Sequence, residues 1–338
     1  MIVFPEKPEV DGRDTVLFLP PNSERRGEGG LRTKGLFKYS YKRVDGRWYA
    51  VSLSGELVRE VDLDVSDWDE LPLVTVITVV LNNVSDIEGT ILSVINQTYP
   101  NVEYIVIDGG STDGTVDVIR EYEDRIDYWV SEPDGGIYYA MNKGIELATG
   151  RWINFMNSGD RFYDEHVVGK VFKRVKEVDC DLIYGEWVDD FGDFQRLREP
   201  FSLCRLWKGM CFSHNSSFAK SKVLKGMKFD TSYVIAADFD LIFKMFTLGF
   251  RFCHISCIIC VSSMGGLSYI SFVKSLWERR HAVKKYRNSL VIDIFYILLI
   301  FDKLFKRLIQ KIIPRRITIF LLKNKYKPFY RFKDFGDG

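Results

Sequence analysis

The sequence predicts an α/β fold in which a mixed β-sheet is flanked by helices. Runs of β-branched residues alternate with helical segments between residues 73 and 160, which is typical of a sheet with crossover helices. Each strand-like run ends in small, polar or acidic residues. The chain has 338 residues and is 46% apolar, so it can form one large domain or two ordinary ones.

Residues 1–70 are predicted to form an N-terminal extension. Residues 20–35 are rich in glycine and charged side chains, which is typical of a loop or an extended arm. Residues 46–61 alternate in polarity around Ser54-Gly55, which predicts a small hairpin. The regular alternation of strands and helices therefore begins after this extension.

Residues 71–270 are predicted to form the main domain. Buried strands are expected at residues 73–81, 102–108, 126–132 and 151–156. Helices are expected at residues 85–97, 112–122 and 136–148. In a sheet of this kind, ligands bind beyond the carboxyl ends of the strands.

The predicted strand ends contain side chains suited to binding a ligand. They are residues 81–83, 108–113, 132–136 and 157–160, which should line one rim. Asp108 is followed by two glycines, which allow a flat ligand to approach the backbone closely. Its carboxylate could accept hydrogen bonds from a ribose or a base. The alternative role is a turn or a helix cap, and it explains Asp113 equally well.

The rim has no motif of the common phosphate-binding loops. Neither GxxxxGK[ST] nor GxGxxG follows the first strand, which disfavours a Walker-type ATPase and an ordinary NAD enzyme. A cation held by Asp160, either Mn²⁺ or Mg²⁺, would neutralise phosphates instead, with Lys143 assisting. One carboxylate can suffice, because phosphates and water supply the other ligands. The alternative role for Asp160 is that of a turn-capping acid.

The order of these motifs resembles that of a family 2 glycosyltransferase, whose GT-A fold is a Rossmann-like nucleotide-binding architecture. The similar stretches are "VTVITVVLNN", "SVINQTYPNVEYIVIDGGSTDGT", "WVSEPDGGIYYAMNKGIELATG", "NSGD", "SHNSSF", "IAADFDLIFKMFTLGFRF" and "GGLS". They span about residues 73–285. In addition, "GGLRTKGLF" at residues 29–37 is similar to a lead-in that precedes this domain in some bacterial relatives.

The resemblance implies a nucleotide-sugar site at the strand ends. Asp108 would bind the nucleoside, with uridine expected. Asp160 would hold the metal where relatives have an Asp-x-Asp-type motif. The other residues implied in donor binding are Val80, Asn82, Asn83, Ser111, Asp113, Asp134, Lys143, Asn157, Ser158 and Gly159.

Asp238 matches the catalytic base of such enzymes. Transfer of a sugar with inversion needs a base that takes the proton of the acceptor hydroxyl, while a metal neutralises the leaving diphosphate. Asp238 also precedes an apolar helix pattern, so the alternative role is an N-terminal cap. Asp240 faces elsewhere and is expected to stabilise the helix start, with contact to donor or acceptor as the alternative.

Two further positions bear on substrate choice. Relatives commonly have Asp-Lys-Gly-Ile-Tyr-Asp-Ala-Met-Asn-Lys-Gly around residues 134–144, but here Gly135 replaces the Lys and Tyr139 replaces the second Asp. Donor selection is therefore expected to depend on Tyr139. His214 lies where similar enzymes have a histidine, which implies contact with donor or acceptor; a structural role is the alternative.

Residues 271–338 are predicted to form a basic helical tail. From residue 274 onwards, 17 Lys and Arg stand against 5 Asp and Glu, or +12; residues 1–273 have 30 against 41, or −11. Residues 301–313 have the spacing of an amphipathic helix ended by Pro314. A membrane surface fits this helix, and packing on the protein or in a homodimer is the alternative. The large apolar face disfavours nucleic acid.

The cysteines favour a reducing environment. Cys253, Cys257 and Cys260 lie in an apolar strand-like run without a second cysteine pair nearby, so they are predicted to be buried free thiols. The N-terminus lacks the basic and apolar regions of a secretory signal. A cytoplasmic location, peripheral to the inner face of the cell membrane, is therefore expected.

These observations predict an inverting glycosyltransferase that moves a sugar from a nucleotide sugar, with UDP expected, to a saccharide or lipid-linked saccharide. It would act in bacterial surface polysaccharide synthesis, such as that of O-antigen or capsule. A nucleotidyltransferase is the first alternative, but "LNNVSD" lacks the glycine-rich basic loop that it needs. A non-catalytic protein that binds a sugar or a nucleotide is the second alternative, and replacement of Asp238 would distinguish it from an enzyme.

Overall fold

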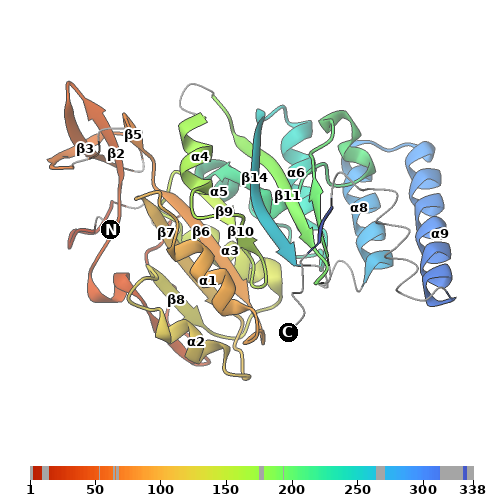
Figure 1. Cartoon of the computed structure of the whole chain (residues 1–338), viewed down its shortest axis with the longest axis horizontal. Helices are drawn as coiled ribbons and strands as arrows, with labels where there is room; N and C mark the ends of the chain where they lie inside the picture. Colours follow the sequence, from red (N-terminus) through yellow and green to blue (C-terminus); the bar gives the residue numbers. More distant parts are fainter. Residues whose placement is uncertain are drawn as a thin grey trace.

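The computed structural model describes residues 3–9, 15–52, 54–63, 65, 68–174, 179–192, 194–263, 271–312 and 330–332. In this part of the chain a mixed sheet forms the centre of the molecule, helices cover it, and a small second sheet lies at the N-terminal end (Figure 1). The predicted fold class is therefore confirmed.

The large sheet is built from strands of both halves of the chain. They are β1 (Gly27–Gly29), β6 (Val74–Val80), β7 (Val102–Asp108), β8 (Tyr128–Ser131), β9 (Trp152–Phe155), β10 (Arg161–Phe162), β11 (Leu182–Asp190), β12 (Phe194–Arg198), β13 (Ser217–Lys220), β14 (Phe252–Ser263) and β15 (Tyr330–Phe332). Their order is β1-β8-β7-β6-β9-β13-β11-β12-β15, with β14 beside β11 and β10 beside β14.

The strands and helices predicted before residue 160 are all present. Strands β6, β7, β8 and β9 are parallel to one another, so their carboxyl ends meet on one side. The helices between them are α1 (Ile87–Ile95), α2 (Thr115–Glu121) and α3 (Ile137–Leu147). Helix α3 approaches the sheet closely at Gly144, where a Cβ would lie 2.5 Å from the Ile77 side chain. A larger residue at position 144 would force the two layers apart.

The second half of the sheet is antiparallel at its junction with the first. Strand β13 is antiparallel to β9 and to β11, while β14 is parallel to β11. The helical segments of this half are α4 (Val167–Arg174), η2 (Leu203–Lys208), η3 (His214–Ser216), α5 (Ser221–Met227) and α6 (Ala237–Thr247). The short helix η3 and the first turn of α6 bring His214 and Asp238 to the side where the parallel strands end.

The N-terminal extension is joined to the main sheet. The predicted hairpin is present as β3 (Arg47–Val51) and β4 (Leu57–Val61), in a small sheet with β2 (Ser40–Val44) and β5 (Glu70–Leu71). Before it, β1 pairs with β8, and helix η1 (Leu31–Lys34) follows. Two buried ion pairs hold this segment: Arg32 with Glu103 at 2.6 Å, and Lys38 with Asp127 at 2.7 Å.

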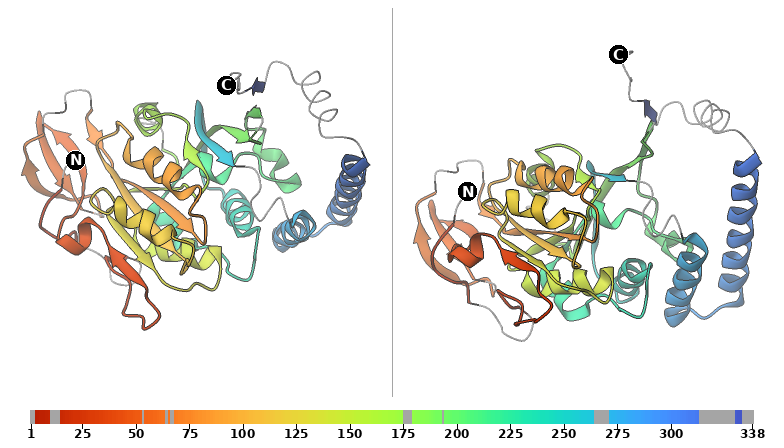
Figure 2. Two further views of the ribbon diagram at one scale, coloured as in Figure 1. Left: turned by 60° about the horizontal axis from the view of Figure 1, so that its bottom comes forward. Right: turned by 90° about the horizontal axis from the view of Figure 1, so that it is seen from below.

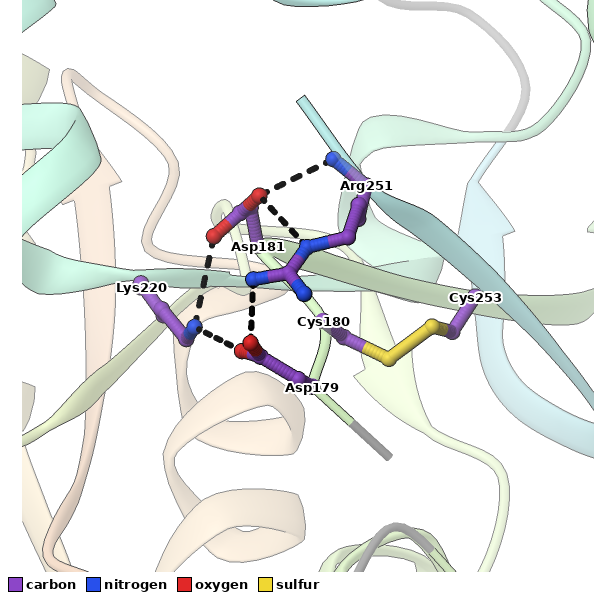
Figure 3. The surroundings of a disulfide bond; sticks show 6 residues. All are labelled: Asp179, Cys180, Asp181, Lys220, Arg251 and Cys253. Carbon is purple, nitrogen blue, oxygen red and sulfur yellow. Dashed lines mark hydrogen bonds and ion pairs between the residues drawn. A yellow bond between two sulfur atoms is a disulfide. The ribbon is translucent and has the colours of Figure 1, made fainter. Parts of the chain in front are cut away.

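One cysteine prediction is wrong. Cys253 is not a free thiol but forms a disulfide with Cys180 (Figure 3). The parallel register of β11 and β14 places Ile183 opposite Cys253, which brings the Cα atoms of the two cysteines to 6.0 Å across 73 residues of sequence. Cys257 and Cys260 are free, as predicted, although only Cys260 is fully buried.

Two long helices, α8 (Phe272–Tyr286) and α9 (Leu290–Ile312), lie side by side at the end of the molecule remote from the small sheet (Figures 1 and 2). The predicted amphipathic helix is thus the second half of a longer one. The inner face of α9 is anchored by Tyr296, whose hydroxyl donates to the Trp207 carbonyl, and by ion pairs from Asp293 to α8.

The opposite face of α9 is exposed and apolar. Its exposed residues are Leu290, Val291, Ile294, Ile297, Leu298, Phe301, Leu304, Phe305 and Leu308. None of the described helices combines the length and the apolar character that a membrane span requires. Residues 315–327, which also mix basic and apolar side chains, lie outside the described residues.

Candidate active site

The loop after β7 is organised by Asp108. One carboxylate oxygen, Oδ2, accepts hydrogen bonds from the backbone N–H groups of Gly110 (3.0 Å) and Ser111 (2.8 Å), and from the Ser131 hydroxyl (2.6 Å). The other, Oδ1, accepts one from the Ser111 hydroxyl. Asp108 is fully buried and its carboxylate accepts hydrogen bonds from this loop and from the neighbouring Ser131, so it shapes the loop.

The ends of β6 and β7 are tied together by side-chain hydrogen bonds. Asn82 adopts φ 49°, a backbone region that asparagine tolerates better than most residues, and its Oδ1 accepts the Thr112 N–H at 2.8 Å. The Ser111 hydroxyl accepts the Asn82 N–H at 2.7 Å. Asp113 accepts hydrogen bonds from Val84 and Thr115, as a turn-organising acid does.

The end of β9 joins the same network. The Asn83 amide donates to the Ser158 hydroxyl at 2.9 Å. Gly159 has φ 96°, which favours glycine, and its turn lets the Asp160 N–H donate to the Asn157 carbonyl. Val80 completes β6 and accepts the Gly109 N–H. The strand ends predicted as a ligand-binding rim are therefore brought together.

Lys143 is committed to neighbouring acids. Its ammonium group lies 2.7 Å from Glu132 and also pairs with Asp134. Burial alone would lower the pKa of Lys143, but these acids raise it overall, so the group is charged. Burial raises the pKa of Asp134, with Glu132 and Asp108 adding to the rise and Lys143 opposing it. Lys143 is therefore held by two carboxylates, and its role toward phosphate stays a prediction.

The N-terminal extension adds arginines that sequence reasoning missed. Arg25 donates to Glu132 at 3.0 Å, and Arg26 donates to the carbonyls of Gly110 (2.8 Å) and Ser111 (3.1 Å). Arg26 is exposed, and among the described residues no carboxylate pairs with it. It is thus a cation at the mouth of the Asp108 loop that can meet an anion or a base. The antiparallel pairing of β1 with β8 places it there.

Asp160 is a half-buried carboxylate with few partners. Oδ1 accepts the Ser263 N–H at 2.9 Å, and Oδ2 accepts the Asn215 amide. Among the described residues, no lysine or arginine forms an ion pair with it. Burial raises the pKa of Asp160 to about 7. A bound cation would relieve the cost of this half-buried charge.

The oxygen atoms around Asp160 fit a hard divalent cation. The amide oxygens of Asn157 and Asn215 are buried and have no hydrogen-bond partner among the described residues. Carboxylate and amide oxygens are the ligands that Mg²⁺ and Mn²⁺ prefer. In the described ranges, no three His, Cys, Asp or Glu side chains are arranged so that they could hold a metal ion together, so further ligands would come from substrate and water. The residues present therefore fit the predicted cation.

A chain of polar contacts links this strand end to Asp238. The Asn157 amide nitrogen lies 3.2 Å from His214 Nε2, and His214 Nδ1 lies 3.5 Å from Asp238 Oδ2. On the other side, the Tyr138 hydroxyl lies 3.2 Å from Asp238 Oδ1. Burial lowers the pKa of His214 despite Asp238, so the ring is neutral at pH 7. An amide donating to Nε2 leaves the proton on Nδ1, facing the carboxylate.

Two candidate residues lie differently. Asp240 is buried between α6 and α8, where it accepts from the Tyr233 hydroxyl at 3.1 Å and pairs with Lys285 at 3.4 Å. It therefore stabilises the helix and does not face Asp238. Tyr139 is exposed, and its ring covers Gly135, where a Cβ would lie 3.0 Å from the ring. Gly135 and Tyr139, the two positions that depart from the motif of relatives, thus pack against each other.

The fold and the rim define a class of α/β proteins whose ligands bind beyond the carboxyl ends of the parallel strands, here without a glycine-rich phosphate loop after the first of these strands. Residues 75–234 match the model of glycosyl transferase family 2. An uncharacterized glycosyltransferase of Mycobacterium tuberculosis is 36% identical over 195 residues, covering 56% of this chain and 74% of that protein. This chain therefore belongs to glycosyl transferase family 2.

Other relatives have names from polysaccharide and glycolipid synthesis. A PGL/p-HBAD biosynthesis glycosyltransferase of Mycobacterium bovis is 28% identical over 216 residues, covering 62% of this chain and 84% of that protein. A putative teichuronic acid biosynthesis glycosyltransferase of Bacillus subtilis is 42% identical over 94 residues, covering 27% and 37%. Family membership makes this chain a glycosyltransferase and sets aside the nucleotidyltransferase and the non-catalytic protein.

Solved structures support the fold. S. aureus TarS 1–349 in complex with UDP-GlcNAc superposes with a TM-score of 0.51 at 16% identity, covering 66% of this chain and 70% of that one. The likeness covers only 40% of the longer TarS chain. The mannosyltransferase PcManGT of Pyrobaculum calidifontis, in complex with GDP-Man and Mn²⁺, gives 0.51 at 18% identity, covering 65% and 66%.

Proposed function

We propose that this glycosyltransferase moves a sugar from a nucleotide sugar, with UDP as the nucleotide, to an acceptor hydroxyl with inversion at the anomeric carbon. The observation that carries the proposal is the contact chain Asn157–His214–Asp238–Tyr138, which puts one carboxylate beside the donor rim. Asp238 takes the hydroxyl proton as the acceptor oxygen attacks the anomeric carbon. The bond to the diphosphate breaks, and the nucleotide leaves with the electron pair.

We propose that the residues at the strand ends bind the donor. Asp108 and Ser111 shape the loop that faces the nucleoside, and Arg26 lies beside its carbonyls. Asp160 would hold Mn²⁺ or Mg²⁺, together with the unpartnered amide oxygens nearby. When bound, the cation neutralises the negative charge that develops on the leaving diphosphate. The complex of PcManGT with Mn²⁺ is consistent with this role.

The base is tested with Asp238→Asn, which keeps the shape of the side chain and removes its basicity. Turnover of a nucleotide sugar should be lost while binding of UDP, measured by calorimetry, is retained. Unchanged turnover would rule out Asp238. For the cation, Asp160→Ala should abolish Mn²⁺-dependent UDP binding, and undiminished binding would reject that site. Asp240→Asn, on the buried side of α6, is the matched control for both.

We further propose that the acceptor is a saccharide or lipid-linked saccharide of a bacterial surface polysaccharide, and that α9 docks on the inner face of the cell membrane. The exposed apolar face of α9 supports this, together with the basic Lys303 and Lys306 beside it. Phe301→Ser with Phe305→Ser should weaken flotation with anionic vesicles. Leu57→Ser with Val58→Ser, which removes exposed apolar side chains on β4, is the control. Equal flotation of the two double variants would contradict membrane docking. If the oligomeric state of the Phe301→Ser, Phe305→Ser variant, measured by light scattering, equals that of wild type, then loss of pairing between copies is excluded as the cause of its weaker flotation.

We also propose that the three predicted segments, residues 1–70, 71–270 and 271–338, act as one unit. Strand β1 of the first lies in the sheet of the second, and α8 of the third packs on α6. Removal of either flanking segment should therefore impair the catalytic domain, as measured by thermal unfolding.

A further inference from the structure

A glutamate of α8 binds the backbone that leads into the candidate base. Glu278 Oε2 accepts hydrogen bonds from the N–H groups of Ile235 (2.8 Å) and Ala236 (2.9 Å), and Oε1 accepts one from Val234 (3.2 Å). Ala236 is the N-cap residue of α6, and Asp238 is the second residue of that helix. One carboxylate therefore holds consecutive N–H groups directly before the helix that presents Asp238.

The same loop is held from its other side by Tyr138. The Tyr138 hydroxyl donates to the Ile235 carbonyl at 2.6 Å and lies 3.2 Å from the Asp238 carboxylate. The backbone at Ile235 is thus fixed between a donor on α3 and an acceptor on α8. A carboxylate at the N-terminal end of a helix is also favoured by the helix dipole, so the site suits the charge of Glu278.

We propose that Glu278 is a positioning residue of this enzyme, which sets the place of Asp238 by holding residues 234–236. The inference rests on the proposed role of Asp238 as the base. The match to the family model ends at residue 234, and α8 lies beyond it. On this proposal, the contact of Glu278 with residues 234–236 makes α8 part of the catalytic unit, although the sequence predicts α8 as part of the C-terminal tail.

The predicted effect is on turnover and not on donor binding. Asp238 approaches the acceptor hydroxyl, whereas the donor is bound at the strand ends. A displacement of a catalytic group by about 1 Å can lower the rate by roughly a hundredfold. Loss of Glu278 leaves consecutive N–H groups without an acceptor, which frees the loop to move. A residue that only stabilises the fold would lower the melting temperature and leave kcat per folded molecule unchanged.

The test compares Glu278→Gln and Glu278→Ala with Asp238→Asn in the full-length chain. Glu278→Ala should lower kcat by about tenfold to a hundredfold, with the KM for the nucleotide sugar and the affinity for UDP within about twofold of wild type. Glu278→Gln should lie between, because its carbonyl oxygen can still accept hydrogen bonds from Ile235 and Ala236. Lys274→Ala, an exposed change on α8, should behave as wild type.

The outcomes separate the two proposals. If Asp238→Asn is inactive and both Glu278 variants keep wild-type kcat per folded molecule, the positioning role is refuted and the base stands. If Asp238→Asn keeps its turnover, the proposed base is refuted, and the inference falls with it. A graded fall in kcat from wild type to Gln to Ala, at constant KM and with Asp238→Asn inactive, supports both.

Discussion

Replacing Arg32 by Met should strongly destabilise the protein, because it would leave a buried carboxylate without its cation. The side chains of Arg32 and Glu103 are each only 2% exposed, and their charged atoms lie 2.6 Å apart. Arg32 also donates to the carbonyls of Leu17 (3.1 Å) and Leu147 (2.9 Å), so it joins the extension to β7 and α3. Removing one partner of a buried ion pair costs about 3–5 kcal/mol.

This cost is large against the total stability of a protein. Unfolding free energies are typically about 5–15 kcal/mol, so the loss would lower the folded-to-unfolded ratio by roughly two to four orders of magnitude. Arg47→Met is the matched control, since Arg47 and its partner Glu60 are 67% and 53% exposed. An exposed pair contributes about 1 kcal/mol or less. Urea unfolding at pH 7.5 would compare the two variants.

The ionisation of Glu103 makes the stability contributed by the Arg32–Glu103 pair depend on pH. Burial alone would raise the pKa of Glu103, but Arg32 and the hydrogen bonds from Thr149 and Thr75 lower it overall from its ordinary 4.5. The ionised carboxylate therefore stabilises the fold above pH 4.5, and this stability is lost as the pH falls through the lower folded pKa. In Arg32→Met the carboxyl can take up a proton instead, so the deficit against wild type should shrink as the pH falls.

A double variant completes the test. Glu103→Gln in the Arg32→Met background removes the uncompensated charge and should recover part of the lost stability. The reasoning is refuted if Arg32→Met costs no more than Arg47→Met, or if its deficit is the same at pH 5 and pH 8.

Three other predictions follow from contacts described above. Arg26→Ala should raise the KM for the nucleotide sugar by about tenfold to a hundredfold with kcat little changed, since one charge-assisted contact contributes about 1.5–3 kcal/mol. An unchanged KM would remove Arg26 from the donor site. Gly144→Ala should destabilise the protein by about 1–3 kcal/mol in thermal unfolding, because the added Cβ would overlap Ile77, whereas Gly169→Ala in α4, whose Cβ would meet nothing within 4 Å, should be neutral or stabilising. Equal effects of the two changes would contradict the close packing of α3. Cys180→Ser should lower the free energy of unfolding by roughly 4 kcal/mol, since the bond closes a loop of 73 residues, and the stability of this variant should no longer depend on reductant. If dithiothreitol destabilises this variant as much as wild type, the pairing is disproved.

The sequence predicted those parts of the molecule that depend on local patterns. The β-branched run at Val74–Val80 is buried along its whole length, and the strand before Asp108 ends where the pattern ends. The polar rim followed from these strands, because parallel strands must end on the same side. Local periodicity was therefore enough to locate Asp108, Asp160 and the Asn82 loop.

The failures involve contacts between residues far apart in the chain. Arg26 meets Gly110 across 84 residues, and Glu278 meets Ala236 across 42. The disulfide depends on the register between β11 and β14, which neither strand specifies by itself. The ion pair of Lys143 with Glu132, 11 residues earlier, was likewise not expected from the sequence, and the role of Lys143 toward phosphate stays a prediction. Such pairings depend on tertiary packing, which propensity and periodicity do not encode.

The two ends of the described chain also determine how the large sheet meets solvent. Strand β1, near the N-terminus, covers the open side of β8, and β15, near the C-terminus, covers the open side of β12. An uncovered strand offers free N–H and C=O groups to other chains and so promotes aggregation. Along this strand order the outermost strands are thus β1 and β15, which have only three residues each and so leave little unpaired backbone. Shortening either end should reduce solubility before it affects chemistry, and a soluble fragment would need a substitute for the strand that it lost.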